Sequence, residues 1–194
     1  MIKTKTNKMS TKTMVLGAVL TALVVILQLM GGFIRLGMFQ ISLVLLPIVI
    51  GAATCGVGVG AWLGFVFGMV VLLNGDAAPF LVVSVPGTII TVLAKGITCG
   101  LTAGIVYKAL EKFNRYTAVV AAAIVCPIVN TGVFLLGCLA FFMNTIREWG
   151  MAEGYTNVVG YMFLGLVGGN FLVELASNII LSPAIVKLLN IKKK

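Results

Sequence analysis

Long apolar segments fill most of this 194-residue chain and limit the kinds of fold that it can adopt. Six such segments cover roughly residues 12–31, 41–54, 57–73, 86–109, 116–143 and 157–189. A helix of about 20 apolar residues crosses the hydrocarbon core of a bilayer, and 60% of the residues are hydrophobic, which is the composition of a membrane protein. Segments of about ten residues with alternating polarity, typical of membrane β-barrels, do not occur. The sequence therefore predicts an all-α integral membrane protein, built as one six-transmembrane-helix bundle over residues 1–194.

The basic residues indicate how these helices are oriented. Of the 14 Lys and Arg residues, four precede or begin the first segment, three lie between the fourth and fifth, and four end the chain. With six spans these groups share one side of the membrane, which the positive-inside rule makes the cytoplasm. We therefore predict a multi-pass protein of the bacterial cytoplasmic (inner) membrane, with basic cytoplasmic ends at residues 1–11 and 190–194. The net charge of +9 then reflects the lipid bilayer as partner, and no nucleic acid is expected.

Several classes of chemistry lack the residues that they need. The chain contains no histidine, which excludes His-dependent acid–base catalysis, His metal sites and Ser-His-Asp triads. Its four cysteines form no Cys-x-x-Cys pair. Cys99, Cys126 and Cys138 lie within apolar segments and are most simply packing residues, and Cys55 lies in a short turn. No phosphate-binding loop of the form G-x-x-x-x-G-K-[ST] occurs, so the chain does not itself hydrolyse ATP through such a loop. We expect neither an enzyme nor a bound metal or cofactor.

Lys95 is the one basic residue that lies well inside an apolar segment. A charge at the centre of a bilayer costs about 2.5–3.5 kcal/mol on insertion scales, so such a residue faces polar groups or a wet cavity. Asn130 and Asn170 lie at a similar depth in two other segments, to within about 6 Å, and Glu174 follows Asn170 by one helical turn. Two interpretations stay open. Lys95 either faces a ligand pocket, or forms an ion pair with Glu174 that only locks the helices together.

The pocket interpretation assigns Lys95 to a polar or anionic group of a ligand, with the two amides as hydrogen-bonding partners. The predicted substrate-binding residues are Gln28, Arg35, Lys95, Asn130, Tyr161, Asn170 and Glu174. Phe134 and Trp62 also belong to this amphipathic pocket. The connections at 31–40, 74–85 and 144–156 mix aromatic residues, glycines and charges, which indicates that the ligand arrives from outside. Few aromatic residues fall at pocket depth, which disfavours ligands with large flat rings.

Two patterns of small residues predict close approaches between helices. Ala18 and Ala22 are four residues apart in the first apolar segment. Glycines recur at the same spacing in the third segment, at positions 56, 60, 64 and 68. The glycines most simply pack against a neighbouring helix of the bundle, and a sliding surface against a partner subunit is the alternative.

Two stretches carry a resemblance to a known family. They are ISLVLLPIVIGAATCGVGVGAWLGFVFG and AAAIVCPIVNTGVFLLGCLAFF. Together with the six segments in about 190 residues, the cytoplasmic termini and the Ala18-x-x-x-Ala22 pattern, they resemble the substrate-binding S component of energy-coupling factor (ECF) vitamin transporters. The two stretches are similar to the subfamily that contains pantothenate-type proteins, and the resemblance covers essentially the whole chain.

The resemblance implies a subunit that captures a small-molecule vitamin outside the cell and delivers it through an ATP-driven module. That module consists of a transmembrane T component and two ATPase subunits. Ala18 and Ala22 match the family pattern that meets the T component, and residues 74–85 would act as a gate. Pantothenate is the expected ligand, because its carboxylate suits Lys95. The alternatives are an S component for riboflavin, folate or a queuosine precursor, and a stand-alone small-molecule transporter.

Overall fold

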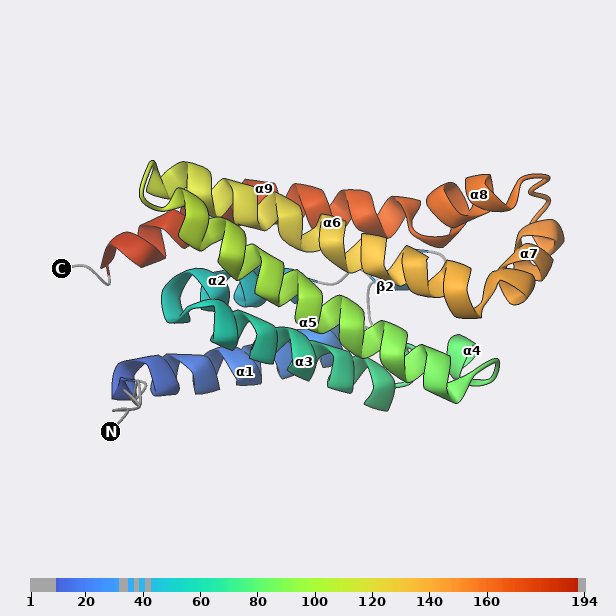
Figure 1. The fold of residues 1–194 in the computed structure, drawn as a ribbon, viewed down its shortest axis with the longest axis horizontal. Helices are drawn as coiled ribbons and strands as arrows, with labels where there is room; N and C mark the ends of the chain where they lie inside the picture. Colours follow the sequence, from blue (N-terminus) through green and yellow to red (C-terminus); the bar gives the residue numbers. More distant parts are fainter. Residues whose placement is uncertain (1–9, 32–34, 37–38, 41–42, 192–194) are drawn as a thin grey trace, which may run out of the picture.

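The structure, a computed structural model, describes residues 10–31, 35–36, 39–40 and 43–191, with side chains over 10–31 and 43–187. Its elements are α1 (Thr11–Gly31), β1 (Arg35–Leu36), β2 (Phe39–Gln40), α2 (Leu45–Cys55), α3 (Val57–Leu73), α4 (Ala78–Leu81), α5 (Val85–Leu110), α6 (Arg115–Phe141), α7 (Met143–Ala152), α8 (Val158–Gly160), the π-helix η1 (Tyr161–Leu166) and α9 (Gly168–Ile191). The long helices lie along one axis and form an elongated bundle (Figure 1). The strands β1 and β2 are a two-residue antiparallel pair.

Four helices in the described part of the chain are long and apolar enough to cross a membrane. They are α1, α5, α6 and the Gly168–Lys187 part of α9. The helices α2 and α3 are also apolar but shorter. Large apolar side chains are exposed on the outside of the bundle, as on a surface that faces lipid: Val15 on α1 is 60% exposed and Ile180 on α9 is 72% exposed. The all-α fold is confirmed, whereas six membrane crossings and cytoplasmic termini stay predictions.

Several helix boundaries differ from those expected. The second apolar segment becomes helical only at Leu45, rather than at residue 41, which lies outside the described residues. The expected connections at 74–85 and 144–156 contain the helices α4 and α7. The prediction of one continuous helix over 157–189 is wrong, because the chain forms α8, then η1, and restarts as α9 after Val167.

A glycine-rich stretch explains why this last segment is interrupted. A Cβ atom on Gly168 would lie 2.7 Å from the backbone oxygen of Phe163, and one on Gly165 would lie 2.6 Å from the ring of Tyr161. Both contacts are closer than real Cβ atoms make, so the backbone path through η1 requires glycine at these positions. Single π-helical turns of this kind often lie at functional sites.

Local capping fixes the two central helices, α5 and α6. Ser84 caps α5 by accepting a hydrogen bond from the backbone N–H of Gly87, and Pro86 occupies the first turn. Asn114 caps α6 by accepting hydrogen bonds from two backbone N–H groups of its first turn. Figure 1 shows the start of α1, the end of α9 and the α5–α6 connection at one end of the bundle. The other end carries α4, α7 and α8, and is called the α7 end below.

Glycines on α3 and α5 bring the backbones of these two helices into contact. Gly64 lies against Gly96, and a Cβ atom on either would overlap the backbone oxygen of the other. Gly60 and Gly100 face each other in the same way one turn further along. Small residues on both helices allow this approach, which gives extensive van der Waals contact. Three glycines of the α3 pattern, Gly60, Gly64 and Gly68, therefore pack against α5 inside the bundle, whereas Gly56 caps the helix and a Cβ atom there would have no neighbour within 4 Å.

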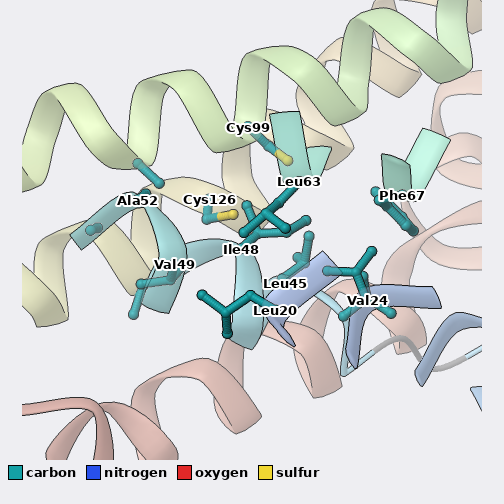
Figure 2. Close-up of a cluster of buried hydrophobic side chains, with 14 of the residues drawn as sticks. Leu20, Val24, Leu45, Ile48, Val49, Ala52, Leu63, Phe67, Cys99 and Cys126 are labelled. Carbon is teal, nitrogen blue, oxygen red and sulfur yellow. The ribbon is translucent and has the colours of Figure 1, made fainter. Parts of the chain in front are cut away.

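The larger of two buried apolar clusters surrounds α2. Leu45, Ile48, Val49 and Ala52 of this helix are each at most 2% exposed and pack among side chains of α1, α3, α5 and α6 (Figure 2). Neighbouring helices cover most of α2, which explains why it can be short. The cluster occupies the half of the bundle that contains α2.

The second buried cluster lies at the α7 end. Its members come from α4, α6, α7 and η1, and include Phe80, Phe134, Phe142, Ile146 and Tyr161. Residues of both clusters line the space between them, among them Phe67 and Val92 from the larger cluster and Phe80 and Phe134 from the smaller one. The packing of the fold therefore leaves a cavity inside the helix bundle.

Candidate functional site

A cavity of about 190 Å³ lies between the two apolar clusters. Residues from α1, α3, α5, α6, η1 and α9 line it, together with the segment from Gly75 to Phe80. A single water needs about 10–15 Å³ by the same measure, so the cavity has room for a small organic molecule. Apolar walls with a few convergent polar groups are typical of small-molecule sites.

Five of the seven predicted substrate-binding residues line this cavity. They are Gln28, Lys95, Asn130, Asn170 and Glu174. Four separate helices contribute them, and three of the side chains are well buried: Gln28 is 4% exposed, Asn130 is 6% exposed and Glu174 is 7% exposed. Lys95, Asn130 and Asn170, which the sequence places at a similar depth in the membrane, thus lie at one cavity.

The other predicted residues lie elsewhere or outside the described side chains. Tyr161 is buried in the α7-end cluster, with its hydroxyl donating to Glu153 Oε1 at 3.4 Å and its ring 5.2 Å from that of Tyr155. Trp62 is 53% exposed on α3 and donates to Thr21 Oγ1 at 3.2 Å. Neither lines the cavity. Arg35 belongs to β1, but its side chain is outside the described part of the structure, so its role stays a prediction.

The ammonium of Lys95 lies over the faces of two phenyl rings. Its Nζ is 5.5 Å from the ring centre of Phe67 on α3 and 5.2 Å from that of Phe134 on α6. Both distances are within the range of about 6 Å over which a ring face attracts a cation. Across the described side chains, Lys95 Nζ has neither a hydrogen-bond acceptor nor a carboxylate at ion-pair distance. The Lys95–Glu174 ion pair considered above is therefore not formed in this structure.

Three buried oxygen or hydroxyl groups around the cavity have no hydrogen-bond partner within the described residues. They are Oδ1 of Asn130, Oδ1 of Asn170 and Oγ1 of Thr91. Leaving a buried polar atom unsatisfied costs about 1–3 kcal/mol, so each such atom in a native fold calls for an explanation. Hydrogen-bond donors on a bound molecule would satisfy all three.

Asp76 is a cavity residue that the sequence analysis missed. Its Oδ2 accepts hydrogen bonds from Gln28 Nε2 at 2.7 Å and from Asn74 Nδ2 at 2.6 Å. Its backbone N–H donates to Asn74 Oδ1 at 3.1 Å. The carboxylate thus joins the α3–α4 connection to α1 at the edge of the cavity. The one signal in the sequence was an acidic residue just after an apolar segment, in the turn Asn74–Gly75–Asp76.

Aromatic residues are more abundant around the cavity than expected. Five phenylalanines line it: Phe67, Phe80, Phe134, Phe142 and Phe171. Phe80 of α4 packs edge-on against three rings, at 5.1 Å from Phe142, 5.6 Å from Phe134 and 5.4 Å from Trp149. The expectation that few aromatic residues lie at pocket depth is therefore wrong: four of the five come from the expected apolar segments, and Phe80 comes from a short helix in an expected connection.

The small-residue pattern of Ala18 and Ala22 lies on the exposed face of α1. Ala18 and Ala22 are both exposed, and Val15, Val19 and Leu23 beside them are 60%, 59% and 38% exposed. This face is smooth and apolar, so it can contact lipid or another membrane helix.

Comparison with known families decides the class of this protein. The family described as the ECF transporter substrate-specific component matches residues 12–186, nearly the whole chain. The chain belongs to this family. No curated protein and no solved structure matches it. As an ECF substrate-specific component, it is a multi-pass membrane protein and a substrate-binding subunit of a transporter rather than an enzyme. Its family implies a small-molecule substrate and a T component/ATPase module as partners.

Proposed function

We propose that this ECF substrate-specific component captures a vitamin, with pantothenate as the best candidate, and delivers it into the cell. Delivery requires a T component and two ATPase subunits, because the chain has no phosphate-binding loop of its own. In this proposal the protein lies in the bacterial cytoplasmic membrane with the α7 end outside. The basic residues Lys108, Lys112 and Arg115 at the opposite end support that orientation.

The observation that carries the substrate proposal is the ammonium of Lys95 at the cavity, without an ion-pair partner among the described side chains. A ligand carboxylate would offset the cost of burying this charge. Pantothenate also has two hydroxyl groups and an amide N–H. These donors match the unsatisfied atoms on Asn130, Asn170 and Thr91 in kind and in number. Glu174 and Asp76 complete the polar lining.

A specific observation favours the alternative ligands. The five phenylalanines around the cavity would stack against a flat ring system. Riboflavin, folate and a queuosine precursor therefore remain alternative substrates of the same transporter class.

Ligand identification tests the substrate. We expect native mass spectrometry of the purified protein to show a bound small molecule with the mass of pantothenate. Titration calorimetry of ligand-free protein should then give tight binding of pantothenate and none of riboflavin or folate. Binding of riboflavin or folate alone would overturn the choice of pantothenate but keep the transporter class.

Reconstitution tests the transport mechanism. We expect proteoliposomes to accumulate substrate only when this subunit, a T component, both ATPases and ATP are all present. Uptake by this subunit alone would support the stand-alone transporter instead.

The exposed face of α1 is the proposed docking surface for the T component. A bulky residue there, as in Ala18→Trp or Ala22→Trp, should abolish assembly and leave ligand binding unchanged. The matched control is Leu172→Trp, because Leu172 is 63% exposed on the distant face of α9. If both alanine variants assemble normally, this face is not the docking surface.

A further inference from the structure

The Lys95 ammonium contacts aromatic rings on two helices, and this placement needs a physical explanation. It contacts the ring faces of Phe67 on α3 and Phe134 on α6. Glu174 on α9 lines the same cavity. A flexible lysine side chain in a low-dielectric site is strongly attracted to such a carboxylate. The contacts of the ammonium with the two rings act against this attraction.

A ring face and a carboxylate attract an ammonium with different consequences. A carboxylate neutralises the ammonium and leaves little field for a ligand. An aromatic ring attracts it through its quadrupole and leaves the net charge unchanged. A lysine held by rings therefore still presents a full positive charge to the cavity.

We propose that Phe67 and Phe134 are positioning residues that give the cavity its preference for an anionic group, by holding the Lys95 ammonium at the wall and away from Glu174. When one ring is lost, Lys95 moves to Glu174 and the cavity loses its available cation. The proposal rests on the proposed function only in its use of pantothenate as a probe. A test without ligand accompanies it for that reason.

The ligand test compares pantothenate with pantothenol, which carries a neutral alcohol in place of the carboxylate. The quantity measured is the ratio of the two Kd values, since a general loss of packing weakens both ligands alike. We expect Phe134→Leu to reduce the preference for pantothenate at least tenfold. Phe134→Tyr, which keeps a ring, should retain the preference. Phe171→Leu removes a cavity ring other than the two that the Lys95 ammonium contacts among the described side chains, and should leave the ratio unchanged.

A second substitution separates positioning from ordinary packing. Glu174→Gln removes the carboxylate that competes for Lys95. The double variant Phe134→Leu/Glu174→Gln should therefore recover most of the preference for pantothenate, although it still lacks the ring. A purely structural role for Phe134 predicts no recovery, and that result would overturn the proposal. If Phe134→Leu does not fold, Phe67→Leu takes its place in the same comparison.

The ligand-free test measures the coupling between Lys95 and Glu174 in thermal unfolding in detergent. It uses Lys95→Met, Glu174→Gln and the double variant, each with and without Phe134→Leu. We expect the melting temperatures to be additive when the ring is present. Without the ring, they should depart from additivity by about 3 °C or more, as a new ion pair of roughly 1 kcal/mol would produce.

The two tests have distinct failures. If the wild-type protein does not bind pantothenate, the proposed substrate is wrong, and the thermal coupling still decides the role of the rings. If pantothenate binds but its preference over pantothenol survives Phe134→Leu and Phe67→Leu, the positioning role is wrong and the proposed function stands.

Discussion

Two faces of α5 differ in how they pack and in how their polar groups are satisfied. One face contacts α3, and the other lines the cavity. Gly96 and Gly100 on the first face touch the backbone of α3 directly. Thr91 and Lys95 on the second face line the cavity with polar side chains. Apolar packing is complete on one side, and hydrogen bonding is incomplete on the other.

This difference shows how a bundle can hold a polar cavity without collapsing around it. Between membrane helices the hydrophobic effect contributes little, and stability comes largely from close van der Waals packing. The glycine contact fixes α5 against α3, so the polar side chains that line the cavity are not needed to hold this helix in place. We therefore expect substitutions on the glycine face to affect folding, and substitutions on the cavity face to affect binding.

Gly64→Val should have the largest effect, because its side chain would overlap the backbone of Gly96. Overpacking of this kind costs about 1–3 kcal/mol and sometimes more, and here it separates two helices. We expect a loss of monodisperse protein on size exclusion, or a fall in melting temperature of about 6 °C or more. Gly132→Ala is the control, since a Cβ atom there has no neighbour within 4 Å. Equal stability of the two variants would contradict the assigned role of the glycine contact.

Lys95→Ala should weaken ligand binding without preventing folding. The protein should still fold, and its affinity for pantothenate should fall at least tenfold, which corresponds to about 1.4 kcal/mol. Lys95→Met should leave the melting temperature of the ligand-free protein unchanged or raise it, because it removes a charge from the membrane interior without breaking an ion pair among the described residues. Calorimetry and thermal unfolding measure the two quantities. Unchanged affinity in Lys95→Ala would falsify its role in binding.

The cavity face also shows what the sequence could predict. Lys95, Asn130 and Asn170 lie in regular helices, so counting about 1.5 Å per residue placed them at one depth, and the structure brings them to one cavity. Polar and charged residues inside membrane segments cost insertion free energy and are rare, so even a single one points to a functional site. Glu174 follows Asn170 by one helical turn and lines the same cavity.

Residues outside the regular helices could not be placed in this way. Tyr161 lies in the π-helix before the break at Val167, where the regular helical spacing no longer applies, and it packs in the α7-end cluster instead. Asp76 and Phe80 belong to a short segment whose path depends on tertiary contacts. Their side chains reach the cavity because that segment folds over its edge, and no periodicity in the sequence records such a path.

Asp76→Asn should have a smaller effect than Lys95→Ala and should act on kinetics. The carboxylate ties the α3–α4 connection to Gln28 of α1 through a charge-assisted hydrogen bond, which is roughly twice as strong as a neutral one. Weakening this tie should let the segment open more often, so we expect the dissociation rate of pantothenate to rise about fivefold, or about 1 kcal/mol, with little change in association rate. Stopped-flow fluorescence can measure both rates. Glu153→Gln makes the same chemical change at the α7 end outside the cavity and should leave both rates unchanged. If the two variants release ligand equally fast, the segment containing Asp76 does not retain the ligand, and the cavity face alone determines affinity.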